Sequence, residues 1–163
     1  MGAHASADAR AVLDAVRRIV RLLRQSDRDA EGKTGLSGAQ LFVLEQLRAA
    51  GGTLTPGELS RRTLTHQSSV SGVVRRLSQA GHVRRVRSTS DARRIELRLT
   101  PAGRAAVRRA PPLAQQRLIS AVDGLEPSRR AALAQGLSDL VRQLGIGVAP
   151  ALMFFEEGDS VAE

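Results

Sequence analysis

Apolar residues recur every three or four positions over several stretches of this chain, a spacing typical of amphipathic helices. The first stretch covers roughly residues 7 to 26. The residues on its apolar face are Val12, Val16, Ile19 and Leu23. The polar segment Gln25 to Gly35 contains two glycines and is expected to form a loop. The pattern therefore predicts an N-terminal helix followed by a loop.

Capping signals mark two further helices. Ser37-Gly38-Ala39-Gln40 reads as a capping box, the apolar stripe behind it is Leu41, Leu44 and Leu47, and Gly51-Gly52 ends the helix. Thr55-Pro56-Gly57-Glu58 combines an N-cap, a proline at the first helical position and a glutamate at the third. The helix that it begins is short and is expected to end near Thr63.

The next helix has two contrasting faces. Thr65 is expected to cap it, and it should run to about Ala80 and stop at Gly81. Its apolar stripe consists of Val70, Val73, Val74 and Leu77. The opposite face holds small polar residues and one long cation, namely Ser68, Ser71, Gly72 and Arg75, with Arg76 at its flank. Two short helices around a tight turn, the second patterned in this way, are typical of a helix-turn-helix.

A β-hairpin is predicted after this helix. Val83 to Arg87 forms its first strand, and Ser88 to Asp91 lies at its tip. Arg94 to Leu99 then alternates strictly, with Ile95, Leu97 and Leu99 inward and Glu96 and Arg98 outward. A basic hairpin directly after a helix-turn-helix indicates a wing.

Proline and glycine divide the remainder of the chain. Thr100-Pro101 begins a helix that Pro111-Pro112 should kink or split in two. Pro127 opens a last helix that reaches about Leu144. The tail from Val148 is apolar and then acidic. We expect its apolar cluster to dock against the terminal helices, on the same or another subunit, and a frayed terminus is the alternative. The cluster consists of Leu152, Met153, Phe154 and Phe155.

Positive charge is concentrated on the predicted helix-turn-helix and wing. Residues 55 to 100 carry ten arginines and three acids, a balance of +7 in a chain whose net charge is +9. An even distribution would indicate only a basic protein, whereas this concentration on one small unit indicates a binding surface for a polyanion.

Other classes of protein are disfavoured by what the sequence lacks. It has no cysteine, which excludes disulfides, thiolate metal sites and thiol redox chemistry. No carboxylate pair, nucleophile–base set or phosphate-binding loop is present, so we expect neither an enzyme nor a cofactor or metal. The longest apolar run, residues 148–155, is far shorter than the ~20 residues of a membrane span. We expect a cytoplasmic protein with no membrane partner.

Several motifs between residues 68 and 103 resemble those of the multiple-antibiotic-resistance regulator (MarR) family. They are Ser68-Ser69-Val70-Ser71, then Leu77, Gly81 and Val83, then Asp91-Ala92-Arg93-Arg94, then Thr100-Pro101-Ala102-Gly103. The chain departs from the family's usual residue types at Gly72, Ser78, His82 and Ala92.

The resemblance implies a mainly α-helical fold with a small β-hairpin wing, in which terminal helices of two subunits interleave. The whole chain, 1–163, would form one MarR-like domain. Its parts would be a winged helix-turn-helix lobe at 36–100, a helical dimerisation lobe at 7–26 and 101–145, and a tail at 146–163. It further implies a homodimer that regulates transcription, usually by repression that a small aromatic or phenolic ligand relieves.

DNA-binding roles are assigned to two groups of residues. Those on the recognition helix are Gln67, Ser68, Ser69, Ser71, Arg75 and Arg76; those on the wing are Arg84, Arg85, Arg87, Asp91, Arg93 and Arg94. Ser68, Ser71 and Arg75 are expected at base edges, and Ser69 at a phosphate or in a helix-start hydrogen bond. Arg93 is expected to probe the minor groove, with Asp91 holding its guanidinium. The remaining wing arginines would neutralise phosphates.

Three functions remain open from the sequence. The first is a ligand-responsive, sequence-specific repressor that binds double-stranded DNA. The second is a DNA-binding regulator without a small-molecule effector. The third is a winged-helix protein-interaction module or a nonspecific DNA-binding protein. Binding to a preferred sequence over random DNA separates the first two from the third.

Overall fold

Helices and a small antiparallel sheet make up most of this protein. The computed structural model describes residues 6–88, 91, 93–146 and 151–154. Its elements are α1 (Ala7–Thr34), α2 (Gly38–Ala49), β1 (Thr53–Leu54), α3 (Pro56–Thr63), α4 (Gln67–Gln79), β2 (Val83–Arg87), β3 (Ile95–Leu99), α5 (Pro101–Arg109), α6 (Ala114–Asp123) and α7 (Pro127–Gln143). The mainly α-helical fold with a hairpin wing is confirmed.

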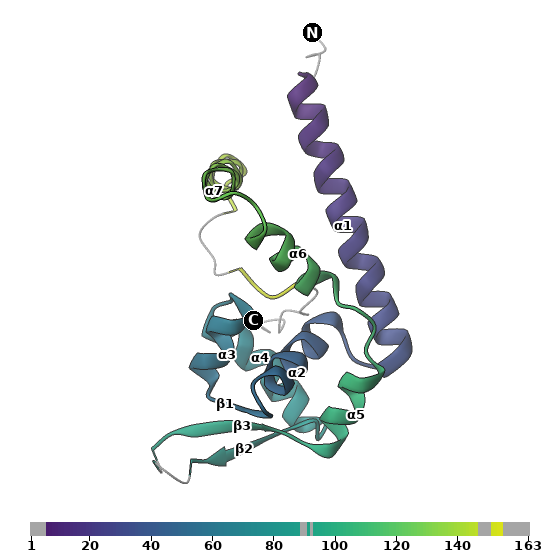
Figure 1. Ribbon diagram of the computed structural model, residues 1–163, viewed down its shortest axis with the longest axis vertical. Helices are drawn as coiled ribbons and strands as arrows, with labels where there is room; N and C mark the ends of the chain where they lie inside the picture. The colour runs from purple at the N-terminus through teal and green to yellow at the C-terminus, as the bar shows by residue number, and fades with distance from the viewer. Residues whose placement is uncertain (1–5, 89–90, 92, 147–150, 155–163) are drawn as a thin grey trace, which may run out of the picture.

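The molecule has two lobes (Figure 1). Helices α2 to α5 and the three strands form the winged lobe, and α1, α6 and α7 form the helical lobe. The long α1 projects away from the winged lobe, and α6 leads to α7 on the side that faces α1. Helix α5, which the sequence grouped with the terminal helices, buries Ala106 and Val107 in the core that α2 shares.

Both predicted capping boxes are present. Ser37 Oγ accepts a hydrogen bond from the Gln40 backbone N–H at 3.3 Å, and Gln40 Oε1 accepts one from Ser37 N–H at 3.0 Å. Thr55 Oγ1 likewise accepts from Glu58 N–H, and Glu58 Oε2 accepts from Thr55 N–H at 2.8 Å. These bonds satisfy N–H groups that the first turn of a helix leaves without partners, so they fix where α2 and α3 begin.

The loop expected at Gln25 to Gly35 is wrong, because α1 continues to Thr34. Ala30 is fully buried in the core cluster, and Thr34 Oγ1 donates to its carbonyl at 2.7 Å. Asp27 Oδ1 also accepts a hydrogen bond from Gly38 N–H at 2.6 Å, which ties α1 to the start of α2. Burial of Ala30 and the bond to α2 outweigh the polar composition and the glycine at position 32.

The cap expected at Thr65 is also wrong. The N-cap of α4 is His66, whose side chain makes no capping bond, and Thr65 Oγ1 instead donates to Thr63 O at 2.9 Å. Leu64 adopts a left-handed backbone with φ of 53°. The turn between α3 and α4 is therefore held by backbone geometry and by the buried helix behind it, and α4 begins two residues after Thr65.

The sheet has the order β1-β3-β2 and is antiparallel throughout. The two-residue β1 escaped prediction because a strand this short has no readable periodicity; it pairs Thr53 with Arg98 and Leu54 with Leu97. Leu97 and Leu99 are buried as expected. Ile95 is 41% exposed, contrary to the expected alternation, because β3 begins out on the wing, beyond the core.

The core lies under the recognition helix. Val70, Val73 and Val74 of α4 are fully buried or nearly so, as predicted. They pack in one cluster with α2, where Phe42 and Val43 are buried together with the expected leucine stripe. Helix α2 is buried on most of its surface and gives α4 a fixed support. This support determines which residues of α4 face solvent.

The two prolines after α5 split the predicted helix. Helix α5 ends at Arg109 and α6 starts at Ala114, whose N–H donates to Ser26 Oγ of α1 at 2.9 Å. The last helix, α7, closes at Gly145 with φ of 69°. In the described part of the chain, no helix has both the length and the apolar character needed to cross a membrane.

Candidate nucleic-acid interface

Helix α4 presents a polar face to solvent because its apolar face is anchored in the core. Gln67, Ser68, Ser71 and Arg75 are exposed, and Arg76 is half-buried at the flank. Ser71 Oγ donates to Gln67 O at 2.8 Å, so its proton stays with the helix and its lone pairs remain available to a donor. The structure thus brings five of the six predicted recognition-helix residues onto one accessible side.

Ser69 does not belong to that side. It is 2% exposed, and its hydroxyl donates to the carbonyl oxygen of Ala151 at 3.3 Å. A buried hydroxyl with a partner inside the protein is not presented to a phosphate, so the structure does not group Ser69 with the residues expected to contact DNA. The helical period places Ser69 at the flank of the buried stripe, and the tail supplies the acceptor for its hydroxyl.

The wing arginines project from the hairpin. Arg84, Arg85 and Arg87 of β2 are exposed, as are Arg93 and Arg94 near the tip. The wing extends from the winged lobe at the end opposite the free part of α1 (Figure 1). Side chains on such an arm can follow a phosphate backbone without displacing the core.

Backbone hydrogen bonds shape the described part of the wing tip. Asp91 Oδ1 accepts from the backbone N–H of Arg93 at 3.0 Å, whereas the guanidinium of Arg93 was the expected partner. Arg94 N–H donates to Asp91 O, and Ser88 N–H donates to Arg94 O, both at 2.9 Å. Asp91 therefore orders the backbone that carries Arg93.

Two glutamates lie among the cations and remain ionised. Hydrogen bonds from Ser88 and Arg98 lower the pKa of Glu96, and Arg98 contacts its carboxylate at 3.0 Å. Hydrogen bonds from the backbone and side chain of Thr55 lower the pKa of Glu58, and the charge of Arg94 adds to this. Both carboxylates accept structural hydrogen bonds, Glu58 at the start of α3 and Glu96 on β3.

The Thr100-to-Gly103 motif joins the wing to α5. Thr100 Oγ1 donates to the carbonyls of Gly81 and His82, at 2.8 and 3.0 Å, and accepts from Gly103 N–H at 3.1 Å. The sequence identified these residues only as a motif; the structure shows that they fix the base of the hairpin against the end of α4. The wing and the recognition helix are thereby held as one unit.

Among the described residues, no group of three or more His, Asp or Glu side chains could hold a metal ion. Helix α4 lies on an apolar support, follows a tight turn after α3 and is followed by a basic hairpin. This arrangement defines a winged helix-turn-helix protein.

Comparisons with known proteins agree with this class. Residues 34–94 match the model of the MarR family. The matched stretch covers the helix-turn-helix and the first strand of the wing. No curated protein sequence matches it significantly.

Several solved structures have the same fold. BpsR of Bordetella bronchiseptica is 27% identical, with a TM-score of 0.55 over 91% of this chain and 99% of that one. Sco3205 of Streptomyces coelicolor, solved in complex with DNA, is 24% identical, with a TM-score of 0.59 over 90% and 94%. A MarR mutant of E. coli, complexed with operator DNA, is 24% identical, with a TM-score of 0.53 over 80% and 95%.

Proposed function

We propose that this protein is a homodimeric regulator that binds a specific DNA sequence in the cytoplasm and represses transcription until a small molecule releases it. The observation that carries the proposal is the exposed face of α4, where Ser68, Ser71 and Arg75 lie between a fixed core and a wing of exposed arginines. Hydroxyls and a guanidinium on a helix of this kind are suited to base edges in the major groove.

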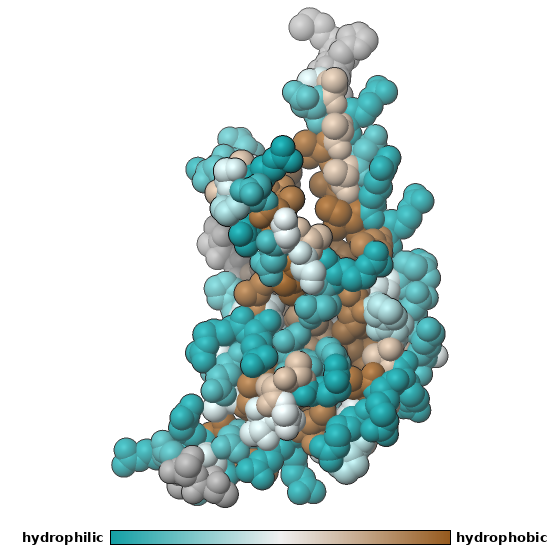
Figure 2. All heavy atoms as spheres, in the orientation of Figure 1, coloured by the Kyte–Doolittle hydropathy of each residue, from teal (hydrophilic) through white to brown (hydrophobic). Residues whose placement is uncertain are grey.

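A dimer is supported by apolar surface on the helical lobe. No residue of α7 is buried, although it carries a row of leucines. Large apolar side chains of α1, such as Val12 and Leu13, are also about half exposed. Figure 2 shows apolar surface where α1 faces α6 and α7. Apolar surface that extends over neighbouring helices is typical of a protein–protein interface. If the partner is a second copy of this chain, the dimer carries two recognition helices that can bind one duplex.

Release by a small molecule is supported by one relative. The structure of BpsR is described as explaining how 6-hydroxynicotinic acid regulates its DNA binding. Because BpsR is 27% identical to this chain over nearly its whole length, we propose that a small aromatic compound controls DNA binding here in the same way.

The electrostatic part of the proposal predicts a steep salt dependence. Each phosphate neutralised should add about −0.9 to the slope of log K against log salt concentration, so several contacts from two wings should give a slope of several units. Titrations of a labelled duplex at four or five salt concentrations measure it. A nearly flat line would contradict nucleic-acid binding altogether.

The division of roles predicts different effects for two arginines. A preferred duplex is first selected from a random pool. Arg75→Ala should cost about 1–3 kcal/mol on that duplex and little on random DNA, because Arg75 is placed to read bases. Arg85→Ala removes the same charge from the wing and should weaken both duplexes alike. Indistinguishable variants, or no duplex preferred over random DNA, would favour a nonspecific binder or a protein-interaction module.

A further inference from the structure

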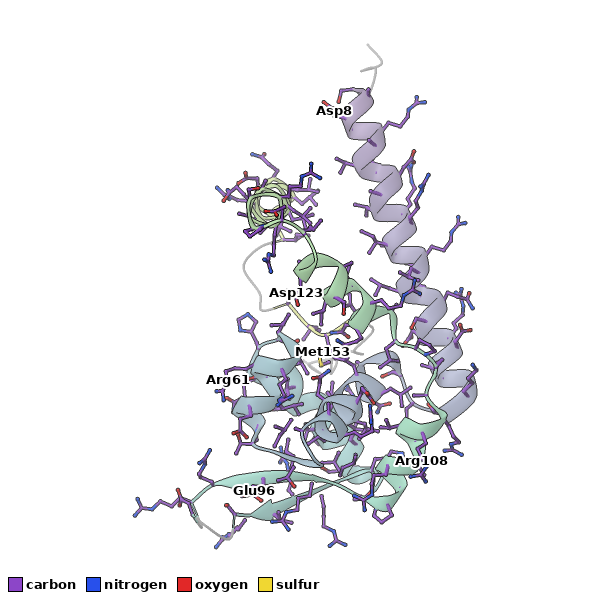
Figure 3. The ribbon with its side chains drawn as sticks, in the orientation of Figure 1. Asp8, Arg61, Glu96, Arg108, Asp123 and Met153 are labelled. Carbon is purple, nitrogen blue, oxygen red and sulfur yellow. The ribbon has the colours of Figure 1, made fainter. Side chains whose placement is uncertain are left out.

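Residues 151–154, the tail segment, lie between the two lobes. In Figure 1 this segment passes between α6 and the helices of the winged lobe, and Figure 3 places Met153 there. Met153 is 4% exposed and belongs to the core cluster, while its neighbour Leu152 is 55% exposed. Only one side of the tail segment is therefore buried. Of the cluster expected to dock, Met153 is buried in the core, Leu152 and Phe154 are about half exposed, and Phe155 lies outside the described residues.

The tail segment contacts the recognition helix directly. The carbonyl oxygen of Ala151 accepts the hydrogen bond of Ser69 Oγ at 3.3 Å. Ser69 is the third residue of α4, and Ser68 and Ser71 on either side of it are exposed on the proposed DNA face. A buried hydroxyl left without an acceptor is unfavourable, so the position of Ala151 and the position of the start of α4 are coupled.

The tail segment also closes a cavity at the helical lobe. Phe154 lines it together with Leu23 of α1 and Leu113 before α6. The remaining cavity volume is about 20 Å³, which is room for about one water molecule. Its polar groups are already used, because Ser26 Oγ accepts from Ala114 N–H and Asp27 Oδ1 accepts from Gly38 N–H. No aromatic compound fits here while Phe154 is in place.

We propose that the tail segment is a built-in occupant of the space between the lobes, and that a small apolar molecule can enter only by displacing it. The docked tail segment holds the start of α4 through Ser69 and supports DNA binding. Displacement removes that bond and weakens DNA binding. The docking part stands on the contacts above, whereas the coupling to DNA rests on the proposed function.

The chain itself offers a clean probe of docking. It contains no Trp and no Tyr, so Phe154→Trp introduces a single indole that reports only on the tail segment. In this background, Met153→Asp should release the tail segment, because a desolvated charge is unfavourable in the core, and should shift the indole emission to the red. Leu152→Asp adds the same charge one residue earlier, on an exposed side chain, and should leave the emission unchanged.

Two further measurements use the same pair of substitutions in the full-length protein. Met153→Asp should bind 8-anilinonaphthalene-1-sulfonate several-fold more strongly than Leu152→Asp, because the vacated site exposes apolar surface.

On the selected duplex, Met153→Asp and Ser69→Ala should each weaken binding several-fold, and Leu152→Asp should match the wild type. Met153→Ser tests the same release without a charge, and circular dichroism checks that each variant is folded.

The outcomes separate the two parts of the proposal. Equal emission and equal dye binding for the two aspartate variants would show that the tail segment is not docked in solution. Docking with unchanged or tighter DNA binding in Met153→Asp would overturn the coupling to α4. If the wild type prefers no duplex at all, the proposed function fails, but the emission and dye results still decide whether the tail segment occupies the site.

Discussion

Replacing Gly103 with alanine is expected to lower the free energy of unfolding by about 3 kcal/mol, at the upper end of what overpacking a core costs. A Cβ atom at this position would lie 2.3 Å from the carbonyl oxygen of His82 and 2.7 Å from Leu99 Cδ1. The leucine side chain can rotate away. The carbonyl cannot move freely, because it accepts hydrogen bonds from the backbone N–H and the hydroxyl of Thr100.

Gly32→Ala is the matched control, since it also adds one methyl group to a helical glycine. Nothing lies within 4 Å of the added Cβ, and Gly32 is exposed near the end of α1. This substitution should raise stability by up to about 1 kcal/mol, because alanine is the better helix former. Thermal or urea unfolding measures both variants. Equal effects from the two would mean that the close approach of α5 to the end of α4 does not exist in solution.

Leu137→Lys is expected to convert the proposed dimer into a monomer. Leu137 is 49% exposed in a single chain and lies on the leucine row of α7, so a dimer would bury it. A lysine amine in the centre of an apolar interface costs several kcal/mol if it stays unpaired. In sedimentation experiments at micromolar concentration, the mass should fall from about twice 17.4 kDa to a single 17.4 kDa. Affinity for the selected duplex should fall at least tenfold, although the variant has gained a positive charge.

Gln135→Lys provides the control, because it adds the same charge on the opposite face of α7. Gln135 already contacts Asp139 Oδ1 at 3.0 Å, so a lysine there keeps a favourable partner one turn away. The control should remain dimeric and should bind DNA as well as the wild type. A wild-type protein that sediments as a folded monomer would refute the dimer, and a dimeric Leu137→Lys variant would place the interface elsewhere.

The sequence was sufficient for the elements whose signals are local. The Ser37 and Thr55 capping boxes, the valine stripe of α4 and the proline pair before α6 each depend on residues within one or two turns, so their patterns could be interpreted without tertiary contacts. The exposed face of α4 then follows from the helical period. This is why most recognition-helix residues were predicted on the correct side.

Features that depend on distant parts of the chain could not be predicted in this way. Helix α1 reaches Thr34 because Ala30 packs on the core. Ser69 is buried by a segment 82 positions further along the chain. Ile95 is exposed because the wing extends past the core that would have covered it. In each case the local residue pattern was compatible with two outcomes, and packing between distant segments selected one.

Short, bonded connections join the lobes, and this affects how such a regulator could change its target. The α1–α2 turn is fixed by the bond between Asp27 and Gly38, and the α5–α6 junction by the bond between Ser26 and Ala114. In the proposed dimer, these joints set the separation and tilt of the two recognition helices, while α4 alone reads the bases. Substitutions at the joints would therefore alter the preferred distance between half-sites and leave each half-site sequence the same. Spacing and base preference could then evolve independently of each other.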